Sequence, residues 1–151
     1  MLRNGSAAIT AAAVLALAGC GSNSNKTLSY GAFVKQANAV CRKADATLKP
    51  LGNKITGEPK ADVAVLTQII SKQEAATASF TALKPPSELK ADFDKFNVLT
   101  ASQTGRTKTA LAVAKTGNKG GYIAVVKSLT PIGVQTDRVA SKLGAKDCVG
   151  A

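Results

Sequence analysis

The stretch VAVLTQIISKQEAATASFTAL, residues 63–83, decides the fold because its apolar positions recur at alternating intervals of three and four. Side chains at that spacing lie on one face of an α-helix. Pro59 suits the first helical turn, Asp62 is favoured there by the helix dipole, and Pro85 and Pro86 follow the end. We therefore predict an amphipathic helix whose buried stripe is Val63, Leu66, Ile70, Gln73, Thr77, Phe80 and Leu83.

Three further stretches, residues 29–49, 87–116 and 118–143, carry the same spacing, and the composition is rich in alanine, the best helix former. Pro50 is expected to stop the first of them, and Pro131 should kink the last or split it in two. Short loops between four amphipathic helices favour an all-α fold, an antiparallel up-down four-helix bundle. The residues predicted to cap helix ends are Ser29, Asn118 and Gly144.

The N-terminal segment differs from the rest of the chain. Arg3 precedes an apolar run over residues 7–17, which is typical of a secretory signal and shorter than the ~20 apolar residues that span a bilayer. The run closes with Leu17-Ala18-Gly19-Cys20, which resembles the lipobox of bacterial lipoproteins. The resemblance implies that Cys20 carries diacylglycerol and palmitate as the mature N-terminus, the alternative being an ordinary signal peptide with an incidental cysteine.

This interpretation divides the chain into three parts. Residues 1–19 are the lipoprotein signal peptide, and residues 20–28 are the lipidated N-terminus with a small, polar, flexible tether. Residues 29–151 are the helical domain. We expect the protein at the cell membrane, anchored by lipid on the extracytoplasmic side, because two or more acyl chains hold a protein stably on a bilayer.

The chain has three cysteines, and lipidation of Cys20 leaves Cys41 and Cys148. An even remainder in an exported protein suggests one disulfide bond, with two free thiols as the alternative. In an up-down bundle the fourth helix ends near the start of the first. The tail after Leu143 can then run back along the first helix and reach Cys41.

Several motifs taken in order resemble small helical-bundle lipoproteins of actinobacteria with one terminal Cys–Cys pair. They are the lipobox, Ala39-Val40-Cys41 in the first helix, Leu83-Lys84-Pro85-Pro86 in mid-chain and the closing segment 143–148. The resemblance implies an envelope location and the disulfide bond. It implies no reaction.

The composition argues against catalysis and metal binding. The chain has no histidine, which is the usual acid–base group and the commonest metal ligand at neutral pH. Asp92 and Asp94 are explained by the dipole of the third helix, and the glycines of residues 117–121 by a turn between helices. We therefore predict no enzyme, no catalytic residue, no metal and no cofactor.

Four polar residues interrupt the apolar stripes and fall near one level when the helices are aligned antiparallel, opposite Ala37. In one interpretation Ile69 and Leu99 fill the seam, and the polar groups pair with each other or with water. In the other, the layer lines a small pocket for a ligand. We favour the first, because buried polar groups are normally satisfied internally. The four residues are Gln73, Thr100, Gln103 and Thr136.

The chain is basic, with 20 Lys and Arg against 9 Asp and Glu. These cations are spread over all four predicted helices, and the aromatic residues lie on the core stripes, so we expect no nucleic-acid partner. A solvated surface explains the charge, as does attraction to anionic lipid headgroups or wall polymers. We predict a non-enzymatic binding or structural module at the cell envelope, with anionic lipid, wall polymer or an unknown protein as partner; the alternative is a carrier of a small ligand in the bundle interior.

Overall fold

The computed structural model describes residues 27–150, and these form helices without any β-strand, so the predicted all-α class is confirmed. None of the described helices is long and apolar enough to cross a membrane. The predicted signal peptide and Cys20 lie outside the described residues. The elements are α1 (Tyr30–Gly52), α2 (Pro59–Thr81), η1 (Ser87–Leu89), α3 (Lys90–Thr116), α4 (Lys119–Lys127), α5 (Leu129–Lys142) and η2 (Lys146–Cys148).

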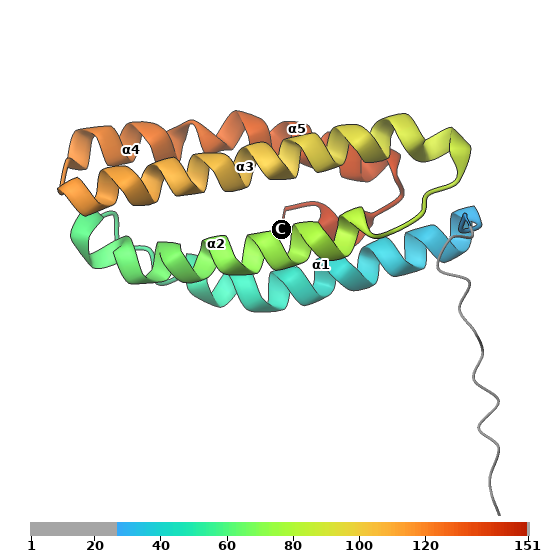
Figure 1. Ribbon diagram of the computed structural model, residues 1–151, viewed down its shortest axis with the longest axis horizontal. Helices are drawn as coiled ribbons and strands as arrows, with labels where there is room; N and C mark the ends of the chain where they lie inside the picture. The colour runs from blue at the N-terminus through green and yellow to red at the C-terminus, as the bar shows by residue number, and fades with distance from the viewer. Residues whose placement is uncertain (1–26, 151) are drawn as a thin grey trace, which may run out of the picture.

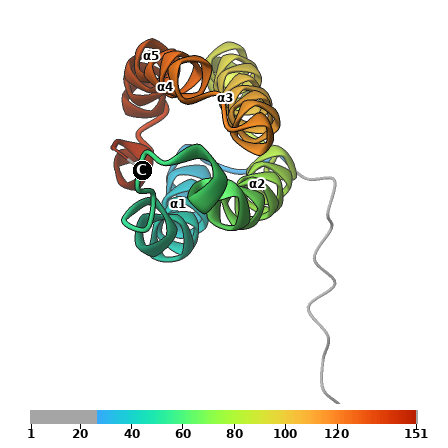
Figure 2. The ribbon, with the colours of Figure 1, turned by 90° about the vertical axis from the view of Figure 1, so that its left-hand side faces the viewer.

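The helices are arranged in two layers, with α1 beside α2 in one and α3 beside α4 and α5 in the other (Figures 1 and 2). The layers meet where α2 packs on α3. On the opposite side, the short η2 segment packs on both α1 and α5 (Figure 2). The C-terminal segment therefore closes the side of the bundle that the long helices leave between them.

The start of α1 agrees with the prediction, and its end does not. Ser29 is the N-cap, and its hydroxyl accepts a hydrogen bond from the backbone N–H of Ala32 at 3.4 Å. The expected stop at Pro50 is wrong, because α1 continues through it to Gly52. In the last turn of a helix a proline removes only one backbone hydrogen bond. Continuing the helix places Leu51 in a buried position, which compensates that loss.

Four other predicted helix ends are confirmed, but the third helix, α3, begins at Lys90 and not at Ser87, because residues Ser87–Leu89 form the 3₁₀ turn η1. Pro59 is the first residue of α2, and Asn118 caps α4 by accepting a hydrogen bond from the N–H of Gly121 at 2.9 Å. Gly117 and Gly144 follow α3 and α5 with φ of 77° and 73°. Glycine adopts this left-handed conformation without the steric cost that a Cβ imposes.

The fourth predicted helix is split in two, as expected near its proline. The break falls at Ser128, between α4 and α5, and Pro131 lies in the first turn of α5. In an unbroken helix the residue at position 131 would donate its N–H to the carbonyl of Lys127, four residues earlier. Proline has no N–H, so the helix restarts just before it.

Two apolar clusters form the core, one towards each end of the bundle. Phe80 lies at the centre of the first, with its ring 6.5 Å from that of Phe33, 5.6 Å from Phe93 and 4.4 Å from Phe96. The second cluster surrounds Tyr122 and includes Leu66, Ala110 and Ala114. Along α2 and α3 the predicted polar layer lies between these clusters.

The predicted disulfide bond is present and joins Cys41 of α1 to Cys148 of η2, which are 107 residues apart in sequence. Polar contacts hold the same segment against α1. The backbone N–H of Asp147 donates to the side-chain oxygen of Asn38 at 2.9 Å, and the Asp147 carboxylate pairs with Arg42 at 2.5 Å. The C-terminus is thus fastened along the middle of α1.

Candidate binding cavity

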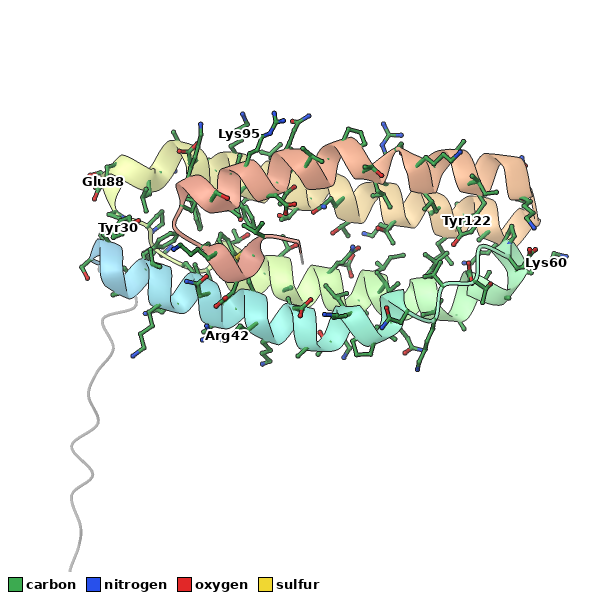
Figure 3. All side chains as sticks on the ribbon, turned by 180° about the vertical axis from the view of Figure 1, so that it is seen from behind. Tyr30, Arg42, Lys60, Glu88, Lys95 and Tyr122 are labelled. Carbon is green, nitrogen blue, oxygen red and sulfur yellow. A yellow bond between two sulfur atoms is a disulfide. The ribbon has the colours of Figure 1, made fainter. Side chains whose placement is uncertain are left out.

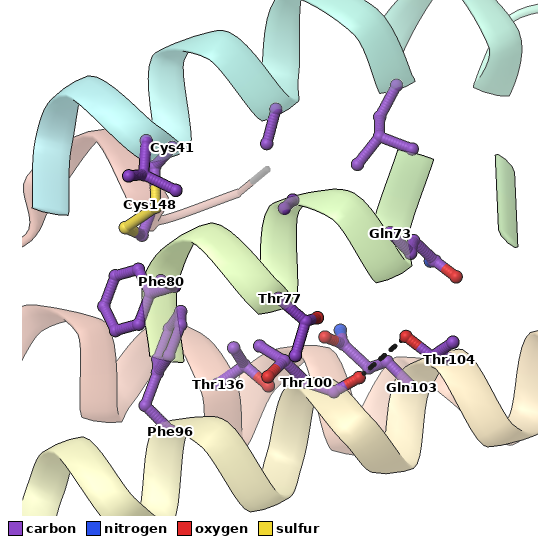
Figure 4. A pocket seen from close by; sticks show the side chains of 14 residues that line it. Cys41, Gln73, Thr77, Phe80, Phe96, Thr100, Gln103, Thr104, Thr136 and Cys148 are labelled. Atoms are coloured by element: carbon purple, nitrogen blue, oxygen red, sulfur yellow. Dashed lines mark hydrogen bonds between the residues drawn. A yellow bond between two sulfur atoms is a disulfide. The ribbon is translucent and has the colours of Figure 1, made fainter. Parts of the chain in front are cut away.

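A partly enclosed cavity of about 130 Å³ lies between α1, α2, α3, α5 and the C-terminal segment (Figure 4). It occupies the level between the two apolar clusters, where the stripes of α2 and α3 change from phenylalanine to amide and hydroxyl side chains. Its lining residues are Val40, Cys41, Ala44, Leu48, Gln73, Ala76, Thr77, Phe80, Phe96, Thr100, Gln103, Thr104, Thr136 and Cys148.

The structure brings together all four residues of the predicted polar layer in the wall of this cavity. Gln73 is on α2, Thr100 and Gln103 are on α3, and Thr136 is on α5. The sequence pattern therefore identified residues that share one level although they come from three helices.

The expected surroundings of that layer differ from the structure. Ala37 is buried in the phenylalanine cluster and does not line the cavity, whereas Ala44, two helical turns later, does. Ile69 and Leu99 do not fill the seam, since neither lines the cavity and Leu99 packs against the phenylalanine cluster. The relative axial position of two helices is set by packing contacts between them, so turn lengths alone placed α1 incorrectly.

Three threonine hydroxyls at the polar end of the cavity donate hydrogen bonds to carbonyl groups of their own helices. Thr100 donates to the carbonyl of Asn97 at 3.0 Å, and Thr104 donates to the carbonyl of Thr100 at 3.1 Å. Thr136 donates to the carbonyl of Ile132 at 2.9 Å. Such bonds to the preceding turn are usual for threonine in helices. Each hydroxyl oxygen retains lone pairs, so the three threonines remain as acceptors.

Gln73 carries a buried acceptor beside the cavity. Its side-chain oxygen Oε1 is buried and has no hydrogen-bond partner among the described residues. Leaving a buried polar atom without a partner costs about 1–3 kcal/mol, so such atoms are uncommon in folded proteins. Gln73 lines the cavity, but this oxygen is enclosed by protein atoms and is not exposed to the cavity.

The opposite end of the cavity is apolar. The Cys41–Cys148 disulfide and the rings of Phe80 and Phe96 lie there, while the amides and hydroxyls gather at the other end (Figure 4). Val40 of α1, next to Cys41, adds aliphatic surface there. The cavity is consequently amphipathic along its length, and no lining residue is acidic or basic.

A second buried polar cluster, centred on Asp62, was not predicted as a site. Asp62 is fully buried, and its carboxylate accepts four hydrogen bonds. One oxygen accepts from the backbone N–H and the hydroxyl of Thr56 at 2.9 and 2.8 Å. The other accepts from the N–H of Gly57 and the hydroxyl of Tyr122, both at 2.9 Å. This carboxylate joins the α1–α2 loop, α2 and α4.

The two titratable groups of the cluster shift in opposite directions. Burial by itself raises the pKa of Asp62, but the hydrogen bonds from Thr56, Tyr122 and Gly57 outweigh it, and the pKa lies below its usual value. Burial, the hydrogen bond to Asp62 and the charge of Asp62 raise the pKa of Tyr122 to about 12. Asp62 is thus charged and Tyr122 neutral at pH 7. Both oxygens of the Asp62 carboxylate already accept hydrogen bonds from the protein, so the cluster has a structural role, and we call it the Asp62 clasp.

A signal for this clasp exists in the sequence. Asp62, Leu66 and Ile70 follow one another at intervals of four residues, so Asp62 extends the buried stripe of α2 by one turn. A charged residue in line with a buried stripe either lies at an exposed helix end or is buried with a hydrogen-bonding partner. The dipole explanation accounted for the position of Asp62 in the helix and missed its burial.

Within residues 27–150, no group of three or more Cys, Asp or Glu side chains is placed to hold a metal ion. The buried polar features described above are the cavity and the Asp62 cluster. A comparison of the chain with protein families, curated proteins and solved structures found no match.

Proposed function

We propose that this protein is a lipoprotein anchored on the extracytoplasmic side of the cell membrane, and that its helical domain binds an anionic component of the envelope. The Leu17–Cys20 motif supports the anchor. The observation that carries the binding role is the display of unpaired positive charge on the domain surface. We propose binding and not catalysis as the role; the one buried carboxylate among the described residues, Asp62, accepts four structural hydrogen bonds.

The surface of the described domain carries more positive than negative charge. Arg3 and Lys26 lie outside the described residues, which leaves eighteen basic residues there against nine acidic ones, of which Asp62 is buried. Five of the basic residues form ion pairs with carboxylates. The other thirteen described basic residues are exposed and have no acidic partner in the described part; Lys60 and Lys95 are two of them (Figure 3).

We infer that the bundle is antiparallel and up-down. At one end, the N–H of Leu28, just before α1, donates to the carbonyl of Lys84, just after α2, at 2.9 Å. At the other end, Lys119 at the start of α4 pairs with Glu58 at the start of α2. Short connections between the helices support the same course of the chain.

We propose that the end of the bundle that holds Leu28 faces the membrane. The Leu28–Lys84 hydrogen bond ties the beginning of the domain to the α2–α3 connection. Eight residues separate Leu28 from Cys20, and at ~3.5 Å per residue they reach at most ~28 Å. Lys35 lies five residues into α1, Lys95 lies five residues into α3, and Lys84 lies in the α2–α3 connection, so these unpaired cations are near this end. We propose that they contact anionic headgroups or polymers, each contributing ~1 kcal/mol near a charged surface.

The anchor is tested by replacing the proposed lipid acceptor. In the native host, the wild-type protein should fractionate with membranes, and its mature form should carry a mass increment of diacylglycerol and an acyl chain. Cys20→Ser should abolish the increment and release the protein from membranes that are washed with high salt, which weakens the proposed cation contacts. Retention of the unlipidated variant on membranes in high salt would contradict the anchor.

The binding role is tested with residues 20–151 carrying Cys20→Ser, so that no lipid contributes. We expect binding to vesicles that contain anionic lipid, weaker binding in high salt, and none to neutral vesicles. Lys35→Gln, Lys84→Gln and Lys95→Gln together should weaken binding about 100-fold, which corresponds to about 3 kcal/mol. The control removes three cations at the far end, with the substitutions Lys54→Gln, Lys60→Gln and Lys115→Gln.

The control should weaken vesicle binding less than the first triple variant. Equal losses would show that the charge acts without orientation and would contradict the proposed contact surface. If the unlipidated wild-type protein fails to bind anionic vesicles at low salt, anionic lipid is not the partner.

A further inference from the structure

We propose that residues 146–150 form a strap over the cavity and that the Cys41–Cys148 disulfide locks this strap, so that reduction of the bond by a dithiol opens the cavity between α1 and α5. The helices themselves stay packed when the strap opens. This inference concerns a redox-sensitive device in the C-terminal part of the domain. It is independent of the proposed envelope binding by the surface cations.

The strap lies where it can control access to the cavity. The main packing partners of α1 are α2 and η2, and those of α5 are α3, α4 and η2, so η2 joins α1 to α5. Figure 2 shows the C-terminal segment in the space between these two helices. Cys41 and Cys148 both line the cavity (Figure 4). Lifting the strap therefore removes Cys148 from the wall and widens the cavity on that side.

Apolar packing holds the strap only weakly. Cys148 is the one buried side chain among residues 146–150, with 4% of its surface exposed. The other residues of the strap are exposed, Val149 by 45%. Leu143 and Ala145, which are buried after the end of α5, precede the strap. Because the strap buries little apolar area, we expect it to open readily once Cys148 is released from Cys41.

The noncovalent polar contacts of the strap are exposed as well. The N–H of Asp147 donates to the side chain of Asn38, and the N–H of Gly150 donates to the carboxylate of Asp137, both at 2.9 Å. The ion pair between Asp147 and Arg42 has two exposed side chains. Exposed hydrogen bonds and ion pairs contribute little, because water competes for the same groups. The disulfide is therefore the contact that decides whether the strap stays closed.

The rest of the domain does not depend on the strap for its packing. The rings around Phe80 come from α1, α2 and α3, and the second cluster surrounds Tyr122 towards the other end of the bundle. A disulfide stabilises a protein mainly by restricting the unfolded chain, so breaking it removes no packing contact between the helices. We therefore expect a local opening of the strap and not unfolding of the bundle.

The opening step is a thiol–disulfide exchange with a dithiol as the reductant. One thiolate of the dithiol attacks a sulfur of the Cys41–Cys148 bond, forms a mixed disulfide and releases the other cysteine as a thiolate, which takes up a proton. The second thiol of the reductant then displaces the remaining cysteine and closes a disulfide within the reductant. The cysteine pair gains two electrons and two protons, which the dithiol loses. Oxidation by a disulfide reverses the step and closes the strap.

The proposal is tested with dithiothreitol as the dithiol, in the absence of denaturant. Residues 20–151 with Cys20→Ser are compared in the oxidised and reduced forms by amide hydrogen exchange. The strap amides of residues 147–150, which are hydrogen-bonded in the closed form, should exchange at least about tenfold faster after reduction. The amide chemical shifts around Tyr122 should stay the same, because that cluster does not contain the strap.

Variants separate the lock from the other contacts. Arg42→Gln removes only the exposed ion pair and should change strap exchange in the oxidised form less than about threefold. Cys148→Ala removes the lock and leaves Cys41 as a free thiol, which iodoacetamide should alkylate within about tenfold of the rate at an exposed thiol. Ser102→Cys on the exposed side of α3 supplies that reference thiol, in a chain that also carries Cys41→Ala and Cys148→Ala.

Three outcomes would overturn the proposal. If dithiothreitol does not reduce the bond without denaturant, the native fold does not respond to a dithiol. If the strap amides exchange as slowly after reduction as before, or Cys41 is alkylated more than about a thousandfold slower than the reference thiol, packing alone holds the strap closed. If the chemical shifts around Tyr122 are lost on reduction, the bond is required for the whole fold and does not act as a lock.

Discussion

Replacing Asp62 by asparagine should destabilise the domain by about 3 kcal/mol, since the carboxylate accepts four hydrogen bonds in a buried position. Asparagine retains one oxygen, which can still accept from the two donors of Thr56. Its amide group then faces the N–H of Gly57 and the hydroxyl of Tyr122. Two charge-assisted bonds at ~1.5–3 kcal/mol each are lost, and relief of burying a charge offsets part of this loss.

The measurement is urea unfolding followed by circular dichroism at pH 7. Asp94→Asn is the matched control, because Asp94 is exposed and pairs only with Lys90 on the same helix. An exposed helix pair contributes about 0.3–0.5 kcal/mol, so this control should be nearly as stable as the wild type. Tyr122→Phe removes one of the four hydrogen bonds and should destabilise by less than Asp62→Asn.

The pH dependence provides an independent check. The pKa of Asp62 is lower in the folded protein than its ordinary value of 3.8, so the unfolded chain takes up the proton first as pH falls. The contribution of Asp62 to stability is therefore complete well above pH 3.8 and is lost at lower pH. The stability gap between wild type and Asp62→Asn should narrow in acid. A gap below about 1 kcal/mol at pH 7, or one that acid leaves unchanged, would refute this account.

Three further predictions concern covalent, ionisable and backbone features. Replacing both Cys41 and Cys148 by alanine should lower the free energy of unfolding by about 4–5 kcal/mol, because the disulfide closes a loop across 107 residues; an unchanged urea midpoint would contradict this. The pKa of Tyr122 is about 12 in the folded protein against an ordinary value of 10.0, so between pH 10 and pH 12 the unfolded chain loses the tyrosine proton first and the folded protein loses stability. The difference in unfolding free energy between wild type and Tyr122→Phe, measured by urea unfolding, should therefore fall from pH 10 to 12. Gly144→Ala should destabilise by about 1–2 kcal/mol because φ is 73° there, whereas Gly105→Ala, at an open helical position, should raise the thermal midpoint; equal effects would contradict the backbone explanation.

Local features of the fold could be predicted because they depend on neighbouring residues. The alternating spacing of residues 63–83 predicts a helix, and α2 covers most of that stretch. Ser29 and Asn118 were identified as caps because a side-chain oxygen satisfies N–H groups of the next turn. Pro50 shows the limit of such rules, since burial of Leu51 extends the helix beyond the proline.

The candidate site was predictable in part. The polar residues on the stripes, such as Gln73 and Gln103, are visible in the sequence, and their common level follows from the helix lengths. Whether such a layer is filled or hollow depends on the axial position and rotation of each helix. A shift of two turns replaces Ala37 by Ala44 in the wall, and this shift depends on contacts between helices.

The sequence by itself determined the helical class and the excess of positive charge, because periodicity and composition are properties of the chain. It favoured the pairing of Cys41 with Cys148 over two free thiols, and the structure shows the bond. Only the tertiary structure decided that the polar layer lines a cavity and that the side-chain oxygen of Gln73 is buried without a partner among the described residues. It also decided that Asp62 is buried against Tyr122, 60 residues away. Burial and hydrogen-bond satisfaction arise from groups that are distant in sequence, and their positions are set by the packing of whole helices.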